Sequence, residues 1–254
     1  MVTVIFPAAG QGKRMKAGMN KVFLQLAGKP ILVRTLLKFS DCPSVDRLVI
    51  VVAADEVHMV SRALQIVPGL KPFVVTAGGS ERQYSIYNGL SCMDPATDIV
   101  LVHDAARPMV TVETIEQVIS AARLHGAAIA AVKEKNTIKL VAADGIVQST
   151  PDRANMWSIQ TPQGFQRELL IEAYMKASQD GFLGTDDASL VERLGRPVYV
   201  VESDYRNIKI TTPEDLLIAE AFLRSGQFSR VKEELHSAVS DVWADVKKNF
   251  LGNR

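Results

Sequence analysis

A glycine-containing segment followed by cations comes directly after the first apolar run of this sequence. Residues 8–15 read AAGQGKRM, and Lys21 follows shortly after them. Small residues and glycines let backbone N–H groups approach phosphate oxygens, because no bulky side chain stands in the way. The segment lacks the Gly-Lys-Ser/Thr ending of a P-loop, and Met15 replaces the third glycine of a dinucleotide fingerprint. Lys13, Arg14 and Lys21 therefore suit a triphosphate, although such residues also occur as ordinary solvated surface charges.

The motif VHDAARP, at residues 102–108, places an acid and a base after another apolar run. Asp104 would lie at the carboxyl end of that strand, where a hard cation bridging phosphate oxygens would bind, and we interpret it as a metal ligand. The guanidinium of Arg107 would match the oxygens of a second phosphate. The alternatives are an aspartate that only forms the turn and an arginine with a structural role.

The motif AGGSERQYS, at residues 77–85, also follows an apolar run and begins a stretch with helical spacing. Its two glycines leave room beside the backbone for a base or a ribose, and a hydroxyl lies near the expected helix start. The alternative is a plain helix N-terminus, capped by Ser80 and with Glu81 in its first turn. That alternative leaves the doubled glycine, Gly78-Gly79, unexplained.

The elements that must position these motifs alternate along the chain. Short apolar runs, typical of strands buried on both faces, occur at residues 3–6, 48–53, 73–76, 99–102 and 127–132. Between them, helical spacing occurs at residues 30–39, 56–67, 81–92 and 111–125. This alternation predicts an α/β fold with a mostly parallel, doubly wound sheet, whose ligands bind beyond the carboxyl ends of the strands.

The alternation changes after Val132. Two short segments, 137–141 and 146–150, flank the tight-turn pair Asp144-Gly145 and predict an inserted β-hairpin. After this hairpin we expect a helix at 166–178, strands around 198–201 and 207–210, and a further helix that begins at Pro213 behind the capping residue Thr212. Beyond Arg224, apolar residues spaced three or four apart predict an amphipathic helical extension over residues 225–254.

Composition excludes several classes of function. The 254 residues include 29 Lys plus Arg and 28 Asp plus Glu, so net charge gives no general attraction to nucleic acid or to an anionic membrane. Cys42 and Cys92 lack the spacing of metal or redox pairs, and we expect two buried free thiols. We find neither an export leader nor an apolar run of about 20 residues, and therefore expect a cytoplasmic protein without a membrane segment.

Taken together, the motifs resemble one family of enzymes, the 2-C-methyl-D-erythritol 4-phosphate cytidylyltransferases of the non-mevalonate isoprenoid pathway. AAGQGKRM, Lys21, GGSERQYS, VHDAARP, NTIK, QTPQGF, GTDDAS and NIKITTPED occur in the order of that family, over roughly residues 2–224. The resemblance implies a Rossmann-like three-layer nucleotidyltransferase domain at residues 1–224, with a hairpin arm at about 134–156. It also implies transfer of CMP from CTP to 2-C-methyl-D-erythritol 4-phosphate, with release of pyrophosphate.

The resemblance further implies a role for individual residues. The CTP pocket would be lined by Ala8, Ala9, Gly10, Gly12, Gly78, Gly79, Ser85 and Ala105. Arg14 and Lys21 would act on the triphosphate at the reacting centre, and Asp104 would hold Mg²⁺. The sugar phosphate would be contacted by Asp104, Arg107, Thr137, Arg153, Thr161, Thr185 and Lys209, of which Lys209 is also catalytic. Thr137 and Arg153, on the arm, would reach into the partner subunit of a homodimer.

Two features depart from the family pattern. Asn20 precedes the reactive lysine where many relatives carry proline, so we expect a less rigid backbone there. The family pattern assigns nothing to residues 225–254, which we expect to pack on the protein's own surface or at a subunit interface. A membrane anchor is disfavoured, because acidic residues nearly offset the basic ones in this extension.

Two other functions remain open at this point. A ribitol-5-phosphate or other polyol-phosphate cytidylyltransferase could use the same CTP loops and differ only around the polyol. A non-catalytic nucleotide-binding protein would have little reason to keep Arg14, Lys21, Asp104 and Lys209 together. A dehydrogenase is disfavoured, because no acidic residue ends the second strand at Ala53-Ala54.

Overall fold

The computed structural model describes residues 1–10 and 20–224, and its centre is a seven-stranded sheet in the order β11-β7-β10-β6-β1-β4-β5. The strands are β1 (Val2–Pro7), β4 (Arg47–Val52), β5 (Phe73–Ala77), β6 (Ile99–Val102), β7 (Ala127–Lys133), β10 (Trp157–Gln166) and β11 (Tyr199–Glu202). Only β10 runs antiparallel to its neighbours in this sheet. The mostly parallel sheet is therefore confirmed.

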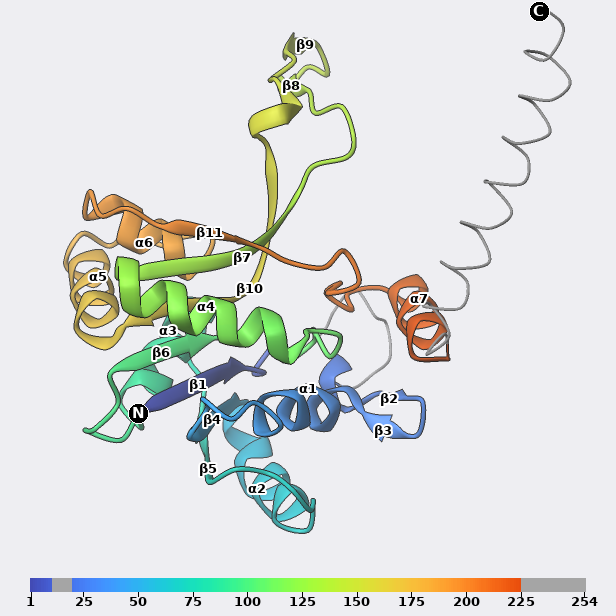
Figure 1. Cartoon of the computed structure of the whole chain (residues 1–254), viewed down its shortest axis with the longest axis vertical. Coiled ribbons are helices and arrows are strands. Elements are labelled where there is room, and N and C mark those ends of the chain that lie inside the picture. Colours follow the sequence, from blue (N-terminus) through green and yellow to red (C-terminus); the bar gives the residue numbers. More distant parts are fainter. Residues whose placement is uncertain (11–19, 225–254) are drawn as a thin grey trace, which may run out of the picture.

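Helices cover both faces of the sheet and complete three layers (Figure 1). They are α1 (Ile31–Ser40), α2 (Val57–Gln65), α3 (Arg82–Leu90), α4 (Val112–His125), α5 (Arg167–Gln179) and α6 (Asp187–Arg193). Successive side chains of a strand point to opposite faces, so Val4 and Phe6 of β1 pack with α1, α2 and α4, whereas Ile5 packs with α3, α5 and α6. Burial on both faces explains why the parallel strands read as continuous apolar runs.

A third, smaller cluster lies beside the sheet. The short strands β2 (Gln25–Leu26) and β3 (Lys29–Pro30) form a hairpin, and α7 (Pro213–Arg224) packs near it through Leu26, Ile31, Ile210 and Ala219. The predicted start of α7 is confirmed, because Thr212 Oγ1 accepts from the backbone N–H of Asp215 at 3.4 Å. This packing brings the segment before α7 close to the end of β1.

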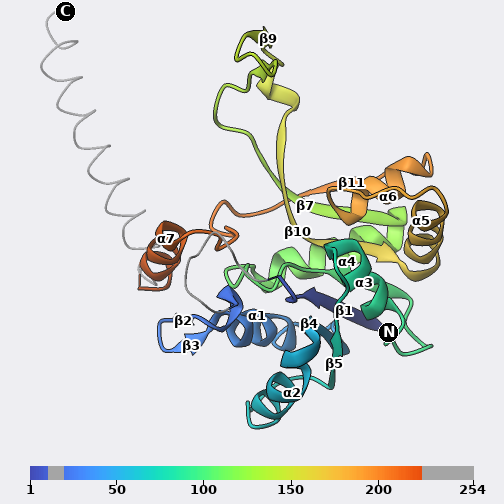
Figure 2. The same ribbon diagram turned by 180° about the vertical axis from the view of Figure 1, so that it is seen from behind.

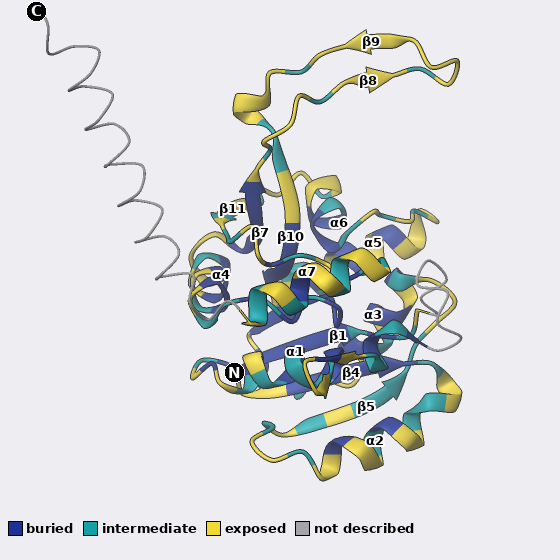
Figure 3. Cartoon of the chain, turned by 90° about the vertical axis from the view of Figure 1, so that its right-hand side faces the viewer, coloured by how far each residue is buried: buried dark blue, intermediate teal, exposed yellow. Residues whose placement is uncertain are grey.

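The inserted hairpin projects from the body as an arm (Figures 1 and 2). It contains β8 (Leu140–Val141), β9 (Val147–Ser149) and the 3-10 helix η4 (Arg153–Asn155), and it joins β7 to β10. Figure 3 shows the arm almost wholly exposed, in contrast to the buried strands of the sheet. Its apolar side chains are uncovered in the single chain, with exposed fractions of 57% for Leu140 and 65% for Ile146.

Several sequence predictions were wrong. Residues 207–210 are not a strand, and β10 and α6 were not predicted. Polar residues and Pro162 interrupt β10, so it lacks the apolar pattern of the parallel strands. Cys42 is buried as expected, but Cys92 is exposed. The extension at 225–254 lies outside the described residues, and among those described no helix is long and apolar enough to cross a membrane.

Candidate active site

A pocket of about 320 Å³ opens beyond the carboxyl ends of β1, β5 and β6, where the sequence predicted a ligand. Five separate stretches line it. They are residues 7–10, residues 20–22, the helix start at 79–82 with Ser85, the loop 104–106, and the later segment with Lys209 and Thr211. The small residues Ala8, Ala9, Gly10 and Ala105 leave the wall open to a bulky ligand.

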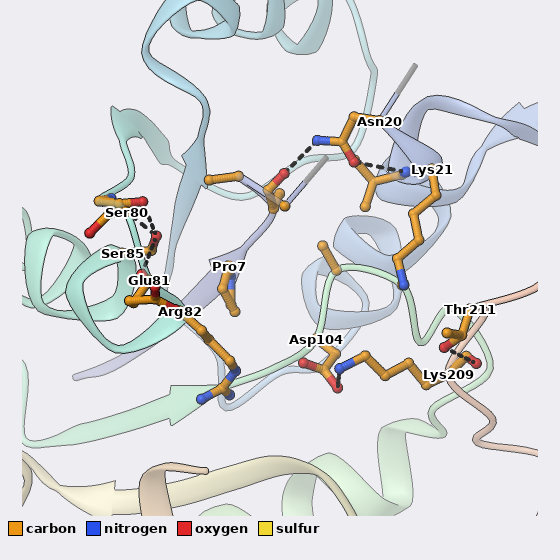
Figure 4. Close-up of a pocket in the computed structure, with 17 residues that line it drawn as sticks. Pro7, Asn20, Lys21, Ser80, Glu81, Arg82, Ser85, Asp104, Lys209 and Thr211 are labelled. Carbon is orange, nitrogen blue, oxygen red and sulfur yellow. Dashed lines mark hydrogen bonds and ion pairs between the residues drawn. The ribbon is translucent and has the colours of Figure 1, made fainter. Parts of the chain in front are cut away.

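Asp104 is the centre of charge in this pocket. Its Oδ2 accepts from Lys209 Nζ at 3.0 Å and from Arg107 Nε at 3.1 Å. Burial alone would raise the pKa of this carboxyl, but the charges of Lys209, Arg107 and Arg82 outweigh burial and hold the pKa well below its usual range. Asp104 is therefore a carboxylate throughout the physiological pH range. Figure 4 shows Lys21, Arg82 and Lys209 pointing into the space around it.

A buried hydrogen-bond relay through His103 and Thr161 fixes the backbone of Asp104. The Nε2 of His103 lies 3.1 Å from the carbonyl oxygen of Arg107, and its Nδ1 lies 3.1 Å from Thr161 Oγ1. A carbonyl can only accept, so Nε2 carries the proton, Nδ1 accepts from the Thr161 hydroxyl, and that hydroxyl accepts from Asp104 N–H at 3.0 Å. Burial lowers the pKa of His103 to about 3, which keeps the ring neutral.

The segment that carries Lys209 has no ladder partner, and a side-chain amide fixes it. Asn207 is fully buried, and its Nδ2 donates to Gln160 Oε1 at 2.9 Å and to the carbonyl oxygen of Thr161 at 2.8 Å. The Asn207 carbonyl accepts from Arg107 Nη1 at 2.7 Å. These contacts tie the Lys209 segment to β10 and to the Asp104 loop at once. These side-chain bonds fix the segment, whereas the incorrectly predicted strand would have been fixed by ladder hydrogen bonds.

Gly78 and Gly79 allow the second loop to approach the first. A Cβ built on Gly78 would lie 2.7 Å from the Cβ of Ala9, so only glycine fits beside the β1 loop. The Gly79 N–H donates to Ser85 Oγ at 3.1 Å. Ser80 does not cap α3 as the alternative interpretation required, because the N-cap is Glu81 and makes no side-chain cap bond.

Arg82 is a pocket residue to which the sequence analysis gave no role. Its Nη2 lies 2.7 Å from Oδ2 of the buried Asp187, whose other oxygen accepts from the Tyr174 hydroxyl. Burial would lower the pKa of Arg82, but the charge of Asp187 outweighs it and raises the pKa. The partner lies 105 residues away. The motif GGSERQYS contained Arg82, but no local signal pointed to Asp187.

The pocket gathers some of the predicted site residues and not others. Its lining includes Ala8, Ala9, Gly10, Lys21, Gly79, Ser85, Asp104, Ala105 and Lys209. Gly78, Arg107 and Thr161 lie directly behind this lining. Thr137, Arg153 and Thr185 are exposed and do not line it, and the first two belong to the arm. Gly12 and Arg14 lie outside the described residues.

The donor set at the pocket suits a metal ion that arrives with a triphosphate. Within residues 1–10 and 20–224, no group of three or more His, Cys, Asp or Glu side chains could hold a metal. Asp104 and Glu81 are the carboxylates of the pocket lining. Mg²⁺ commonly binds through one or two carboxylates together with substrate phosphates. A single ionised Asp104 facing the pocket fits that mode.

Comparisons with known proteins show which family the sequence is similar to. The family model of 2-C-methyl-D-erythritol 4-phosphate cytidylyltransferase matches residues 2–225. A protein of that name from Geobacillus kaustophilus is 52% identical over 219 residues, which cover 86% of this chain and 95% of the relative. One from Caldanaerobacter subterraneus is 47% identical over 224 residues, covering 88% and 99%.

Solved structures lead to the same group of proteins. The crystal structure of 4-diphosphocytidyl-2C-methyl-D-erythritol synthase from Anaerococcus prevotii aligns with a TM-score of 0.78 at 33% identity, covering 88% of this chain and 98% of that one. The 2-C-methyl-D-erythritol 4-phosphate cytidylyltransferase of Francisella tularensis aligns with a TM-score of 0.72 at 34% identity, covering 86% and 97%. The similarity thus extends over nearly the whole of each relative.

Proposed function

The chain belongs to the 2-C-methyl-D-erythritol 4-phosphate cytidylyltransferase family, and from this premise we propose that its pocket transfers CMP from CTP to 2-C-methyl-D-erythritol 4-phosphate. A phosphate oxygen of the acceptor bonds to the α-phosphorus of CTP, and the bond to the leaving pyrophosphate breaks. The product is 4-diphosphocytidyl-2-C-methyl-D-erythritol. The observation that carries the proposal is the convergence of Lys21, Arg82 and Lys209 around Asp104, in a pocket walled by small residues.

The chemistry requires positive charge more than it requires a base. The attacking phosphate oxygen is already anionic, so the barrier comes from bringing two negative phosphates together and from charge that accumulates at the α-phosphorus. Lys21 and Arg14 would neutralise that charge and the charge of the leaving pyrophosphate. Arg14 enters the proposal through the sequence motif, whereas Lys21 lines the pocket. No side chain needs to accept a proton in this step.

Asp104 and Lys209 would orient the acceptor. The ion pair at 3.0 Å holds the ammonium of Lys209 beside the pocket, where it can meet the phosphate of the incoming polyol. Arg107 supports Lys209 through the same carboxylate and through the Asn207 carbonyl. The ionised Asp104 would also bind Mg²⁺ carried by CTP, which would supply charge neutralisation to the triphosphate oxygens.

The exposed arm supports the expected homodimer. Thr137 and Arg153 are exposed on the arm and do not line their own pocket, and apolar side chains such as Leu140 and Ile146 lie uncovered beside them. A homodimer in which each arm reaches the partner's pocket would cover these side chains and deliver Thr137 and Arg153 to the polyol phosphate. Thr185, also exposed, would complete the polyol side.

The cytosol suits the enzyme, because both cysteines are free thiols.

One assay tests the proposal against its alternatives. Pyrophosphate release is measured with CTP or UTP, each combined with 2-C-methyl-D-erythritol 4-phosphate or ribitol 5-phosphate. We expect release with CTP and the methylerythritol phosphate, at least tenfold above the other three pairs. Preference for ribitol 5-phosphate would identify a different polyol-phosphate cytidylyltransferase. No release with any pair would leave a nucleotide-binding protein without this activity.

A further inference from the structure

Asn20, the residue before Lys21, is buried, and both the nitrogen and the oxygen of its side-chain amide form hydrogen bonds. Only 7% of the residue is exposed. Its Nδ2 donates to the carbonyl oxygen of Ala8 at 2.6 Å, and its Oδ1 accepts from Val22 N–H at 3.4 Å (Figure 4). The same Nδ2 also donates to Glu56 Oε2 at 3.4 Å. The side chain therefore uses both of its donor hydrogens and its acceptor.

These bonds connect the turn of the reactive lysine to two strands. Lys21 begins the 3-10 helix η2 (Lys21–Phe23), for which Asn20 is the N-cap. Ala8 follows β1 and also donates to the Val51 carbonyl of β4 at 2.6 Å. Glu56 Oε2 accepts from the Ala53 N–H, just beyond β4, at 3.2 Å. One amide thus joins the lysine's turn to the ends of β1 and β4, at the place where residues 8–10 line the pocket.

We propose that Asn20 is a positioning residue that fixes the distance between Lys21 and the small-residue loop that receives the nucleotide. The inference rests on the proposed function, since it assigns Lys21 to the reacting phosphates. A reacting geometry is sensitive to small displacements, and a shift of about 1 Å can cost roughly 10²-fold in rate. A buried amide with its bonds formed limits such a shift, because breaking them leaves buried polar groups unpaired.

The backbone conformation at residue 20 is also one that a proline could adopt. Asn20 has φ −62° and ψ 124°. A proline ring fixes φ near −65°, so it would hold the same backbone without the amide. The side-chain hydrogen bonds of Asn20 and a proline ring would thus hold this backbone in the same conformation.

Three substitutions separate the contributions of this side chain. Asn20→Ala removes all its bonds. Asn20→Asp keeps the acceptor for Val22 N–H but places a carboxylate against the Ala8 carbonyl and Glu56. Asn20→Pro removes the amide but fixes φ. In steady-state pyrophosphate release, we expect kcat to fall about 10- to 100-fold for the alanine and aspartate variants and to stay within about threefold of wild type for proline. KM for CTP should change less than about threefold.

Asn88 supplies the matched control. Its Nδ2 also donates to a carbonyl at the end of a strand, that of Ala77, at 3.1 Å, but it does not line the pocket. Asn88→Ala should keep kcat within about twofold of wild type. The inference is wrong if Asn20→Ala keeps wild-type kcat. It is also wrong if Asn20→Ala and Asn88→Ala lose kcat equally, since loss of any such amide would then slow the enzyme. It is likewise wrong if Asn20→Pro is as slow as Asn20→Ala, since a fixed φ would then not position Lys21.

A second readout keeps this test independent of the activity. The rate at which a water-soluble acylating reagent modifies Lys21 is measured by mass spectrometry in the folded wild type and in the same variants. We expect Asn20→Ala to change that rate at least threefold, and Asn20→Pro and Asn88→Ala to leave it unchanged. If wild type releases no pyrophosphate, the proposed function fails while the labelling still decides whether Asn20 positions Lys21. Equal labelling of all variants would overturn the inference.

Discussion

The ammonium of Lys209 lies 3.0 Å from Oδ2 of Asp104, on the same oxygen that accepts from Arg107. One mostly buried carboxylate therefore holds two cations from different segments. The attraction of each cation to this carboxylate offsets the repulsion between them, so both can remain beside a pocket that binds phosphates. The arrangement makes the position of Lys209 depend on the charge of Asp104 as well as on its shape.

Substituting Asp104→Asn preserves shape but removes that charge. We expect kcat to fall about 10²- to 10³-fold, as for loss of a preorganised electrostatic group. We also expect the free energy of unfolding to fall by about 3 kcal/mol, because Lys209 and Arg107 lose a buried partner. Steady-state kinetics and urea denaturation measure the two effects. Wild-type kcat in this variant would contradict the role of the ion pair.

Thr161 should act through its hydroxyl. Thr161→Val leaves Asp104 N–H and His103 Nδ1 without a partner, whereas Thr161→Ser keeps the relay. We expect valine to lower the free energy of unfolding by about 1–3 kcal/mol and kcat by at least tenfold, with serine near wild type. Were Thr161 to contact the sugar phosphate directly, KM for that substrate would rise with kcat little changed. The split between kcat and KM decides.

His103 should make stability depend on pH. Its pKa is about 3 in the fold and about 6.5 when unfolded. Between these values the unfolded chain binds the extra proton, so stability falls as pH drops from 6.5 and this contribution is lost in full below pH 3. We expect His103 to account for a decrease on the order of 2–3 kcal/mol between pH 7 and pH 4. In His103→Gln the decrease over this range should be smaller by that amount. Equal pH slopes in urea denaturation would contradict the buried neutral ring.

Arg82 should contribute to nucleotide binding through its pairing with Asp187. Arg82→Ala removes a pocket cation, and we expect KM for CTP to rise about tenfold, a loss typical of one charge-assisted contact. Asp187→Asn should raise it in the same direction, because Arg82 loses its charged partner. Arg193→Ala provides the control, since Arg193 pairs with Asp180 at the surface. An unchanged KM in both pocket variants would exclude Arg82 from the CTP site.

The arm should act across subunits. Ile146→Glu places a charge in the expected interface, and sizing should show a monomer, whereas Leu124→Glu, on exposed α4 surface, should leave a dimer. Mixing Lys21→Ala with Arg153→Ala subunits should restore about a quarter of wild-type activity, because half of the dimers would then have one intact site. If the arm served its own pocket, the mixture would stay inactive.

The sequence was sufficient for the parallel part of the fold. Each strand buried on both faces is an unbroken apolar run, as in residues 127–132 of β7. Helices with their own period connect β4, β5, β6 and β7 in turn. β10 escaped prediction because Gln160, Thr161 and Gln163 use their polar groups in side-chain bonds that only the folded chain brings together. Its position between β6 and β7 depends on contacts distant in the sequence.

The residues of the site could be predicted from motifs, but the hydrogen bonds and ion pairs between them could not. Lys209 was identified from its motif, yet the alternation Asn207-Ile208-Lys209-Ile210 was mistaken for a strand. The side-chain amide of Asn207 donates to residues of β10, and the Ile210 N–H donates to the Ala106 carbonyl at 2.9 Å. Neither bond belongs to a strand ladder. Arg82 needed a partner on a distant short helix, α6. Residue types can be read locally, whereas the pairing of charges requires the fold.

The single reversed strand has a consequence for where the chain can leave the sheet. A connection between two parallel strands must return from the carboxyl end of the first strand to the amino end of the sheet before the next strand begins. Because β10 runs the other way, its first residue, Trp157, pairs with Lys133 at the last position of β7. The chain can thus depart and re-enter on the same rim that holds the pocket. One inverted direction gives the molecule a free loop at its ligand-binding rim, and any lengthening of that loop extends outward without disturbing the layers beneath.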